Sequence, residues 1–253
     1  MLRECIAAIE KSGDVELLKK YPCQPAGNPR IFNWNGIPVT YRWIKHIHHL
    51  GTVNRVLRPS LGEGFSVLDI GSSYGVFSYM MNREYPGSHH VLVDLPNQLF
   101  YAHYFLRSCF PDARIAGART IAELGTITRA TIDAYDFILL PADNFEQLCG
   151  GIDLVTSFSC LGELKRSVFD RYLQSEAFRN AKYFYTSNPV DKNMAIPDAE
   201  VCILDYPIHD PAKRLFFGIS PVFTYFYGPP KRKGPFGYKL NPMDPYFECI
   251  TEI

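Results

Sequence analysis

Three residues in the second quarter of the chain have the types and spacing of a ligand-binding turn. Asp69, Gly71 and Gly75 form the pattern D-x-G-x-x-x-G, with a short apolar run at 65–68 before it and helical periodicity at 76–83 after it. A glycine turn between a buried strand and a helix N-terminus allows a ligand to approach the backbone and its free N–H groups. The pattern therefore predicts a strand, a binding turn and a helix in succession.

The spacing of the glycines distinguishes between classes of ligand. A dinucleotide-binding fingerprint, G-x-G-x-x-G, would have glycine where this chain has Ser73 and Val76, so an NAD-dependent oxidoreductase is disfavoured. The next predicted strand, 89–93, ends at Asp94, whose carboxylate can accept hydrogen bonds from two hydroxyl groups at once. The turn and this acid together favour a nucleotide-like ligand. The alternative is a glycine turn that is only structural.

This arrangement resembles motif I of the class I S-adenosylmethionine (SAM)-dependent methyltransferases. The resemblance implies a Rossmann-like, doubly wound and mostly parallel α/β sheet that binds SAM and releases S-adenosylhomocysteine (SAH). In that family the turn passes close to the amino-acid part of SAM, and the acid after the second strand holds the ribose hydroxyls. Asp143 fits the position that meets the adenine amino group; alternatively, it caps a short helix at 145–148. The residues predicted on this basis to bind the cofactor are Asp69, Gly71, Ser72, Ser73, Gly75, Asp94, Leu95, Asp143, Asn144 and Ser157.

A second resemblance concerns the acceptor. The sequence V-D-L-P with the aromatic stretch N-Q-L-F-Y-A-H-Y-F-L, followed later by D-L-V-T-S-F-S-C-L-G-E-L, is similar to the sugar O-methyltransferase family. The segments 27–29 and 35–37 also look like the entry segment of that family, so the likeness covers residues 27–189. It implies methylation of a sugar hydroxyl, in polysaccharide biosynthesis or on a glycosylated metabolite. The alternatives are O- or N-methylation of a small aromatic metabolite, and a non-catalytic SAM- or nucleotide-binding subunit.

Methyl transfer to an alcohol requires a base near the acceptor oxygen, because an alcohol is a poor nucleophile until its proton leaves. Glu163 is the first candidate, because it follows the strand whose end ordinarily faces the methyl group in that family. The alternative is that Glu163 only complements a helix dipole. His46 and His49 are the second candidates, three residues apart on one helix face. The alternative places them, together with His48, at the surface or in a lid.

The sequence predicts no metal site. His46 and His49 share a helix face, but a metal bound there needs carboxylate partners, and the sequence places none nearby. Some sugar methyltransferases use magnesium. Mg²⁺ is left open for this chain and is not predicted, because Asp94, Asp143 and Glu163 already have other roles.

The composition excludes several kinds of partner. The chain has 253 residues with 26 basic and 26 acidic side chains, so a nucleic-acid backbone is not an expected partner. The seven cysteines are scattered without a C-x-x-C pair, which favours free thiols in a reducing cytoplasm. No apolar stretch approaches the ~20 residues that a membrane span requires, and the N-terminus does not resemble a signal peptide. We therefore expect a soluble, cytoplasmic protein with a small-molecule or saccharide acceptor.

The elements that would position these residues alternate between strand and helix, which predicts a largely parallel sheet with helices on both faces. Residues 1–60 are expected to form an N-terminal helical cap, with helical periodicity at 2–20 that breaks at Gly13, a loop with one short strand at 21–38, and a helix at 40–57. Residues 61–253 are expected to form the SAM-binding domain. Its predicted strands lie at 65–68, 89–93, 114–118, 136–140, 152–157, 183–186, 201–204 and 215–219, and its helices at 76–83, 95–108, 121–124 and 167–180.

The C-terminal part of the chain is rich in proline, glycine and aromatic residues, and 228–247 is predicted to be a closing loop. The aromatic segment 225–246 could stack on the apolar face of a sugar, cover a sheet edge or form the contact of a homodimer. Its short basic run, Lys231, Arg232 and Lys233, either meets a nucleotide-sugar diphosphate or is a solvated turn.

Overall fold

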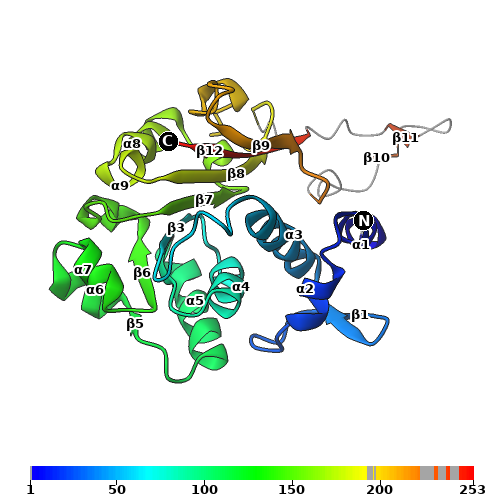
Figure 1. Ribbon diagram of the computed structural model, residues 1–253, viewed down its shortest axis with the longest axis horizontal. Coiled ribbons are helices and arrows are strands. Elements are labelled where there is room, and N and C mark those ends of the chain that lie inside the picture. Colours follow the sequence, from blue (N-terminus) through cyan, green and yellow to red (C-terminus); the bar gives the residue numbers. More distant parts are fainter. Residues whose placement is uncertain (1, 193–195, 197, 223–230, 233–237, 240–244) are drawn as a thin grey trace.

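The computed structural model describes residues 2–192, 196, 198–222, 231–232, 238–239 and 245–253. An eight-stranded sheet crosses its centre (Figure 1). The order of its strands is β5 (Ile115–Ala116), β6 (Phe137–Pro141), β4 (His89–Asp94), β3 (Ser66–Ile70), β7 (Leu154–Phe158), β8 (Tyr183–Pro189), β12 (Tyr246–Glu252) and β9 (Arg214–Ile219). Strands β5, β6, β4, β3, β7 and β8 are parallel, and β12 is antiparallel to both β8 and β9. This mixed, mostly parallel sheet is the Rossmann-like α/β fold of the methyltransferase type, so the predicted fold class is confirmed.

The central strands are short apolar runs because they are buried on both faces. All five residues of β3 and of β7 are buried, as expected for parallel strands that are covered by helices on both sides. Successive side chains of one strand point to opposite faces. In β3, Val67 belongs to the core cluster on one face, whereas Leu68 and Ile70 belong to the cluster on the other.

Nine α-helices of the described chain divide between the two faces of the sheet. Helices α1 (Leu2–Ser12), α2 (Val15–Lys20), α3 (Tyr41–Val56), α4 (Val76–Glu84) and α5 (Pro96–Cys109) contribute to the first cluster. Helices α6 (Ala118–Leu124), α7 (Arg129–Asp133), α8 (Arg166–Gln174) and α9 (Glu176–Arg179) contribute to the second. Figure 1 shows α6 to α9 on its left-hand side and the N-terminal helices on its right.

Helix α3 packs against the sheet and carries those residues of the candidate functional site that come from the N-terminal part of the chain. Its N-cap, Thr40, accepts a hydrogen bond from the backbone N–H of Trp43 at 3.1 Å, which satisfies a free donor of the first turn. The indole of Trp43 donates to the carbonyl of Tyr21 at 2.7 Å and so fixes the preceding loop. The division of the chain into a cap at 1–60 and a domain at 61–253 stays a prediction.

Three predicted elements differ from the structure. The predicted strand 201–204 is wrong: it is the short 3₁₀ helix η3 (Ile203–Asp205), in which the Asp205 carboxylate accepts from the Cys202 N–H at 2.8 Å. The predicted helix 167–180 is interrupted at Ser175, which caps α9 by accepting from the Phe178 N–H at 3.2 Å. The loop at 21–38 contains two strands, β1 (Phe32–Trp34) and β2 (Ile37–Val39), instead of one.

The predicted closing loop 228–247 is wrong at its end, where Tyr246 and Phe247 begin β12. Most of this loop and of the aromatic segment 225–246 lies outside the described residues. Of the basic run, Lys231–Arg232 form β10, paired with β11 (Tyr238–Lys239). The proposed contacts of this segment with a sugar, a diphosphate or a second copy therefore stay predictions.

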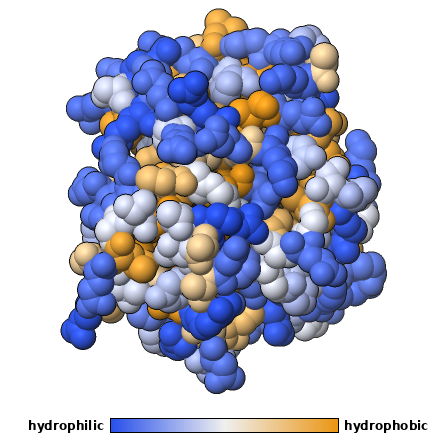
Figure 2. Space-filling view, turned by 60° about the vertical axis from the view of Figure 1, so that its left-hand side comes forward, coloured by the Kyte–Doolittle hydropathy of each residue, from blue (hydrophilic) through white to orange (hydrophobic). Residues whose placement is uncertain are grey.

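No helix of the described residues is long and apolar enough to cross a membrane. On the face shown in Figure 2, hydrophobic residues appear in small groups among hydrophilic ones. All seven cysteines lie in the described part of the chain as free thiols, as their scattered positions predict.

Candidate functional site

The glycine turn lies between β3 and α4, as its sequence predicts. Gly71, Ser73 and Gly75 have φ angles of 80°, 52° and 83°, in the left-handed region that favours glycine. Gly75 is the N-cap of α4, so the chain turns sharply from the buried strand into the helix. The backbone conformation is by itself a sufficient reason for glycine at 71 and 75 and for a small polar residue at 73.

The first glycine also allows a second loop to approach. A Cβ atom at Gly71 would lie 2.3 Å from the Cβ and 2.5 Å from the Sγ of Cys160, in the loop after β7. The space where a side chain of residue 71 would lie is therefore filled by Cys160. Close packing of the two loops explains this glycine.

Asp94 connects the second strand to the turn. Its carboxylate accepts from the backbone N–H of Ser73 at 2.6 Å and from that of Leu95 at 2.7 Å. Leu95 is the N-cap residue of α5 and its side chain is exposed. Each carboxylate oxygen has two lone pairs, so Asp94 retains capacity to accept from hydroxyl groups of a ligand.

A cavity of about 240 Å³ lies beside this turn, and we call it the turn cavity. Side chains from α3, β3, the glycine turn, the end of β7 and the loop beyond it form its walls. The residues that line it are Arg42, Lys45, His46, Asp69, Gly71, Ser72, Ser73, Phe158, Ser159 and Glu163. The structure thus brings together Glu163 and His46, which the sequence predicts as bases, and four residues of the predicted turn.

Three polar atoms in the walls of the turn cavity have no hydrogen-bond partner among the described residues. They are the hydroxyls of Ser72 and Ser159 and Nδ1 of His46, all of them buried. Buried polar atoms are nearly always hydrogen-bonded, so three orphaned groups in one cavity indicate a polar ligand or ordered water. Ser159 also has a φ of 54°, an unusual conformation for a serine.

Charged groups of opposite sign line different walls of the turn cavity. Arg42 and Lys45 come from α3; the Arg42 guanidinium donates to the Ser73 hydroxyl and lies 5.2 Å from the Tyr74 ring centre. Burial lowers the pKa of Lys45 to about 7. On the β3 wall, Asp69 is 2% exposed and accepts from Thr156 Oγ1 at 2.8 Å, and burial raises its pKa to about 7.

The loop that carries Ser159 and Glu163 is fixed by the end of β8. The side-chain oxygen of Asn188 accepts from the N–H groups of Cys160 and Gly162, each at 3.1 Å. Glu163 lies in the 3₁₀ helix η2 (Leu161–Glu163), before α8 and outside its first turn. The alternative that Glu163 complements the dipole of α8 is therefore not supported.

The three histidines of α3 have different surroundings. Burial lowers the pKa of His46 well below its ordinary value and that of His49 to about 4, so both rings are neutral at pH 7. The His49 ring stacks on Phe158, with ring centres 4.0 Å apart, and is not among the residues that line the turn cavity. His48 and His49 are 4% and 0% exposed, so their placement at the surface or in a lid is wrong.

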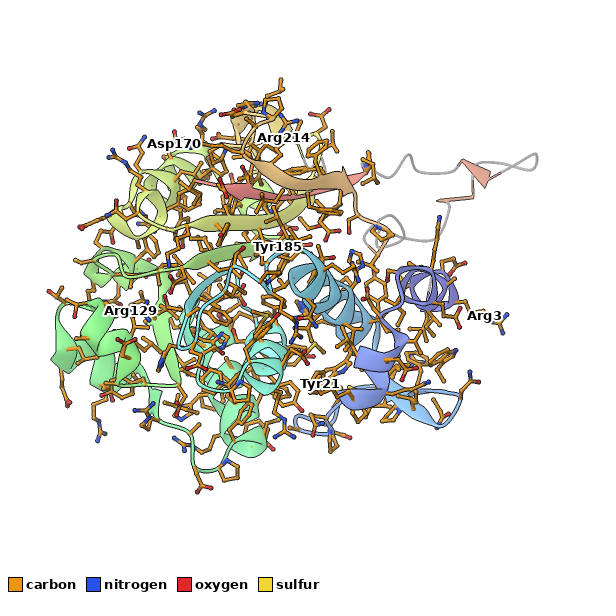
Figure 3. All side chains as sticks on the ribbon, in the orientation of Figure 1. Arg3, Tyr21, Arg129, Asp170, Tyr185 and Arg214 are labelled. Carbon is orange, nitrogen blue, oxygen red and sulfur yellow. The ribbon has the colours of Figure 1, made fainter. Side chains whose placement is uncertain are left out.

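A buried polar cluster joins α3 to the C-terminal strand behind the turn cavity. Glu248 of β12 is hydrogen-bonded to His48 Nε2 at 2.9 Å and to the hydroxyl of Tyr185, which in turn meets His49 Nδ1 at 2.9 Å. Tyr185 lies between the sheet and α3 (Figure 3). The histidine and carboxylate atoms lie within 4.8 Å of one another, so they are also a candidate metal-ligand set. The carboxylate that the sequence did not place near these histidines comes from 200 residues away.

The remaining predicted binding residues lie elsewhere. Asp143 is exposed in the 3₁₀ helix η1 (Ala142–Gln147), whose N-cap is Pro141 without a side-chain hydrogen bond, so the capping alternative is wrong. Asn144 follows it. Ser157 is buried in β7, and its hydroxyl accepts from the Leu161 N–H at 3.4 Å. Ser157 therefore shapes the loop and does not line the turn cavity.

A larger cavity of about 460 Å³ adjoins the turn cavity, and we call it the aromatic cavity. Arg42 and Ser73 line both cavities, so the two are neighbours. The other residues that line the aromatic cavity are Gln24, Ala26, Gly27, Pro29, Trp43, Tyr74, Gln98, Tyr101, Tyr104 and Phe105. Tyr101 and Tyr104 are more than half exposed, so aromatic faces are open to solvent here.

Several residues of the site were missed from the sequence. Arg42 and Lys45 have the same helical spacing as His46 and His49, and this shared face of α3 was the available signal. Asn188 and Glu248 carried no such signal, because each meets its partners only through the pairing of distant strands.

No protein-family model matches the chain, and no curated protein matches its sequence. Solved structures are similar at low identity. The mitomycin 7-O-methyltransferase MmcR is 13% identical over 84% of this chain and 57% of its own, with a TM-score of 0.42. PKMT2 from Rickettsia typhi, in complex with AdoHcy, is 20% identical over 55% of this chain and 24% of its own, with a TM-score of 0.37. The precorrin-6y C5,15-methyltransferase from Geobacter metallireducens is 15% identical over 82% of this chain and 86% of its own, with a TM-score of 0.37.

The chain thus spans about a quarter of the length of PKMT2 and little more than half that of MmcR. Likenesses this weak carry no argument about the activity. The fold assignment stands on the order and direction of the strands.

Proposed function

We propose that this protein is a SAM-dependent methyltransferase that methylates a hydroxyl group of a sugar or a glycosylated metabolite. The observation that carries the proposal is the turn cavity. It lies at the carboxyl end of β3, where ligands bind in doubly wound sheets, and it combines orphaned hydroxyls with opposite charges on different walls.

These walls fit the amino-acid part of SAM, which carries an ammonium and a carboxylate. Asp69 and Glu163 would face the ammonium, and Arg42 would face the carboxylate. The Ser72 and Ser159 hydroxyls, which have no partner among the described residues, would complete the hydrogen bonds of the bound group. A small cavity of about 240 Å³ suits this end of the ligand and not the whole of it.

The nucleoside part would continue along the ends of the neighbouring strands. Asp94 would accept from the ribose hydroxyls. An apolar cavity of about 210 Å³ lies at the ends of β4 and β6, with Pro96, Leu99 and Pro141 among its walls. Its volume and apolar walls suit an adenine ring, with Asp143 and Asn144 close by in the sequence to meet the amino group.

The aromatic cavity is the proposed acceptor site. Its volume lies in the usual range for small-molecule sites, and it adjoins the turn cavity at Arg42 and Ser73. Exposed tyrosine rings can stack on the apolar face of a sugar, and the amides of Gln24 and Gln98 can bind its hydroxyls. The same rings favour one alternative, a small aromatic metabolite methylated on oxygen or nitrogen.

SAM supplies a methyl group that is already a strong electrophile, so the chain must align the acceptor and remove its proton. Glu163 and His46 line the turn cavity and remain candidate bases, whereas His49 stacks on Phe158 and does not line this cavity. A non-catalytic SAM-binding subunit is the second alternative, and it would bind SAM without turnover.

The proposal is tested by titration calorimetry of the protein with SAH, with NAD as the control ligand. We expect micromolar binding of SAH and none of NAD. Asp94→Ala should abolish SAH binding, whereas Asp112→Ala, which changes an exposed aspartate outside the site, should leave it unchanged. If SAH does not bind the unmodified protein, the proposed function is wrong.

A panel of nucleotide sugars and phenols, incubated with SAM and analysed by mass spectrometry, then tests the acceptor. A mass increase of one methyl group on a sugar supports the proposed acceptor, and one on a phenol supports the first alternative. SAH binding with no product from either class supports the non-catalytic subunit.

A further inference from the structure

Lys45 is a lysine buried in the wall of the turn cavity. Its side chain comes from the second turn of α3 and is 7% exposed, whereas lysine side chains are mostly exposed in folded proteins. It lines the same cavity as Asp69, Ser159 and Glu163, in which the amino-acid part of SAM, the part joined directly to the sulfonium, is proposed to lie.

We propose that Lys45 is a catalytic residue whose ε-amine takes the proton from the acceptor hydroxyl as that oxygen receives the methyl group. This inference rests on the proposed function and names a residue for it that the sequence did not indicate. It gives the site a base that is part of the rigid helix α3, and not of a surface loop.

The groups around Lys45 explain its state of charge. Burial lowers its pKa first, and the neighbouring Arg42 guanidinium lowers it further, to about 7; Cys5 and Glu163 act in the opposite direction. The Tyr41 ring lies 5.4 Å from its Nζ. The titratable and charged groups that surround it are therefore Tyr41, Arg42, His46 and His49 of α3, Cys5 of α1, Asp69 of β3 and Glu163 of η2.

Lys45 suits the task better than the two candidates from the sequence. A general base is most effective when its pKa is near the working pH, because it is then both available and basic enough. Burial makes His46 a weak base. A carboxyl group ordinarily has a pKa of about 4, so a carboxylate is a weak base at neutral pH. An amine with a pKa of about 7 is neutral in half of the molecules at neutral pH.

The reaction step balances without a further reactant. The acceptor O–H bond breaks and its proton moves to the Lys45 nitrogen, while the oxygen forms a bond to the methyl carbon. The carbon–sulfur bond breaks, and its electron pair stays on sulfur. One positive charge is thereby moved from the sulfonium to the Lys45 ammonium, and the products are the methyl ether and neutral SAH.

The proposal predicts a proton linkage that can be measured without an acceptor. The sulfonium of SAM is a cation, so its approach disfavours the ammonium form of Lys45 and should expel the proton. SAH carries no charge at sulfur. Binding of SAM should therefore release more protons than binding of SAH, up to one more per site, between about pH 6 and 7.

Calorimetric titrations with SAM and with SAH at pH 6.5, in buffers of different ionisation enthalpy, give this number. We expect SAM to release more protons than SAH both in the unmodified protein and in Lys19→Met, which changes an exposed lysine outside the site. Lys45→Met should still bind SAH but should lose the difference. Asp69 also titrates near neutral pH in this cavity, and any proton release that comes from it would remain in Lys45→Met.

The outcomes separate the two proposals. Retention of the difference in Lys45→Met overturns the role of Lys45 and leaves the proposed function intact, because SAH still binds. Failure of both ligands to bind the unmodified protein overturns both proposals.

If Lys45→Met does not fold, the charge of Lys45 is followed in the unmodified protein by NMR of ¹³C-labelled lysine. The Lys45 signal should then titrate at lower pH with SAM bound than with SAH bound. Equal titration in the two complexes refutes the proposal.

Discussion

At the residue scale, a single glycine combines two physical requirements. Gly71 has a left-handed backbone conformation, and the side chain of Cys160 occupies the space where its Cβ would be. Either requirement alone disfavours any other residue, and together they bind the turn to the loop that carries Ser159 and Glu163. The geometry of the glycine turn and that of the loop after β7 are therefore not independent.

Replacing Gly71 with alanine should lower the free energy of unfolding by about 3 kcal/mol, since it adds backbone strain and an overlap with Cys160. Urea unfolding at equilibrium measures the change. Gly62→Ala is the matched control, because a Cβ there would meet nothing within 4 Å, and it should leave stability unchanged. Equal stability of the two variants would show that the turn relaxes freely.

At the element scale, the C-terminal strand and helix α3 depend on each other. β12 lies between β8 and β9, and its Glu248 carboxylate, 0% exposed, meets His48 of α3 and Tyr185 of β8. Burial by itself would raise the pKa of Glu248, but His48 and His49 hold it well below its usual range, so the carboxyl group is ionised inside the core. The same helix carries Arg42, Lys45 and His46, and the cluster therefore positions one wall of the turn cavity.

Glu248→Ala should destabilise the protein by about 3 kcal/mol, because it leaves buried groups of His48 and Tyr185 without their acceptor. Glu252→Ala, at the exposed end of the same strand, should have little effect. Thermal or urea unfolding compares the two. If Glu248→Ala lowers the free energy of unfolding no more than Glu252→Ala does, the cluster contributes little to the link between β12 and α3.

At the scale of the whole molecule, the free energy of unfolding should depend on pH because one histidine is buried in its neutral form. His90 of β4 is 1% exposed, and burial lowers its pKa from 6.5 to about 3. Below pH 6.5 the unfolded chain binds a proton at His90 that the folded chain does not. The stability from this neutral ring is complete above pH 6.5 and is lost progressively as the pH falls toward 3.

Each proton taken up on unfolding changes stability by about 1.4 kcal/mol per pH unit. In His90→Leu the unfolding free energy should therefore fall less steeply as the pH decreases from 6 to 4. The slope should be smaller by about 1.4 kcal/mol per pH unit. Urea unfolding at several pH values measures the slope, and His209→Gln, an exposed histidine, is the control. Parallel slopes for unmodified protein and His90→Leu would contradict the assignment.

The sequence by itself determined the strand, turn, helix and strand between residues 65 and 94, and with them the fold class. These features are local: backbone conformation at Gly71 and Gly75, apolar runs in β3 and β4, and an acid at a strand end depend on neighbours along the chain. The helix at 40–57 was likewise predicted from its periodicity, and the structure confirms it as α3.

Only the tertiary structure decided what surrounds the turn. The packing of α3 over the end of β3 brings Arg42 and Lys45 beside Asp69, and no spacing in the sequence specifies that contact. The insertion of β12 brings Glu248 to His48 across 200 residues. The charge states of Lys45 and Asp69 follow from burial, which belongs to the assembled fold; for that reason residue type alone pointed to Glu163 and the histidines.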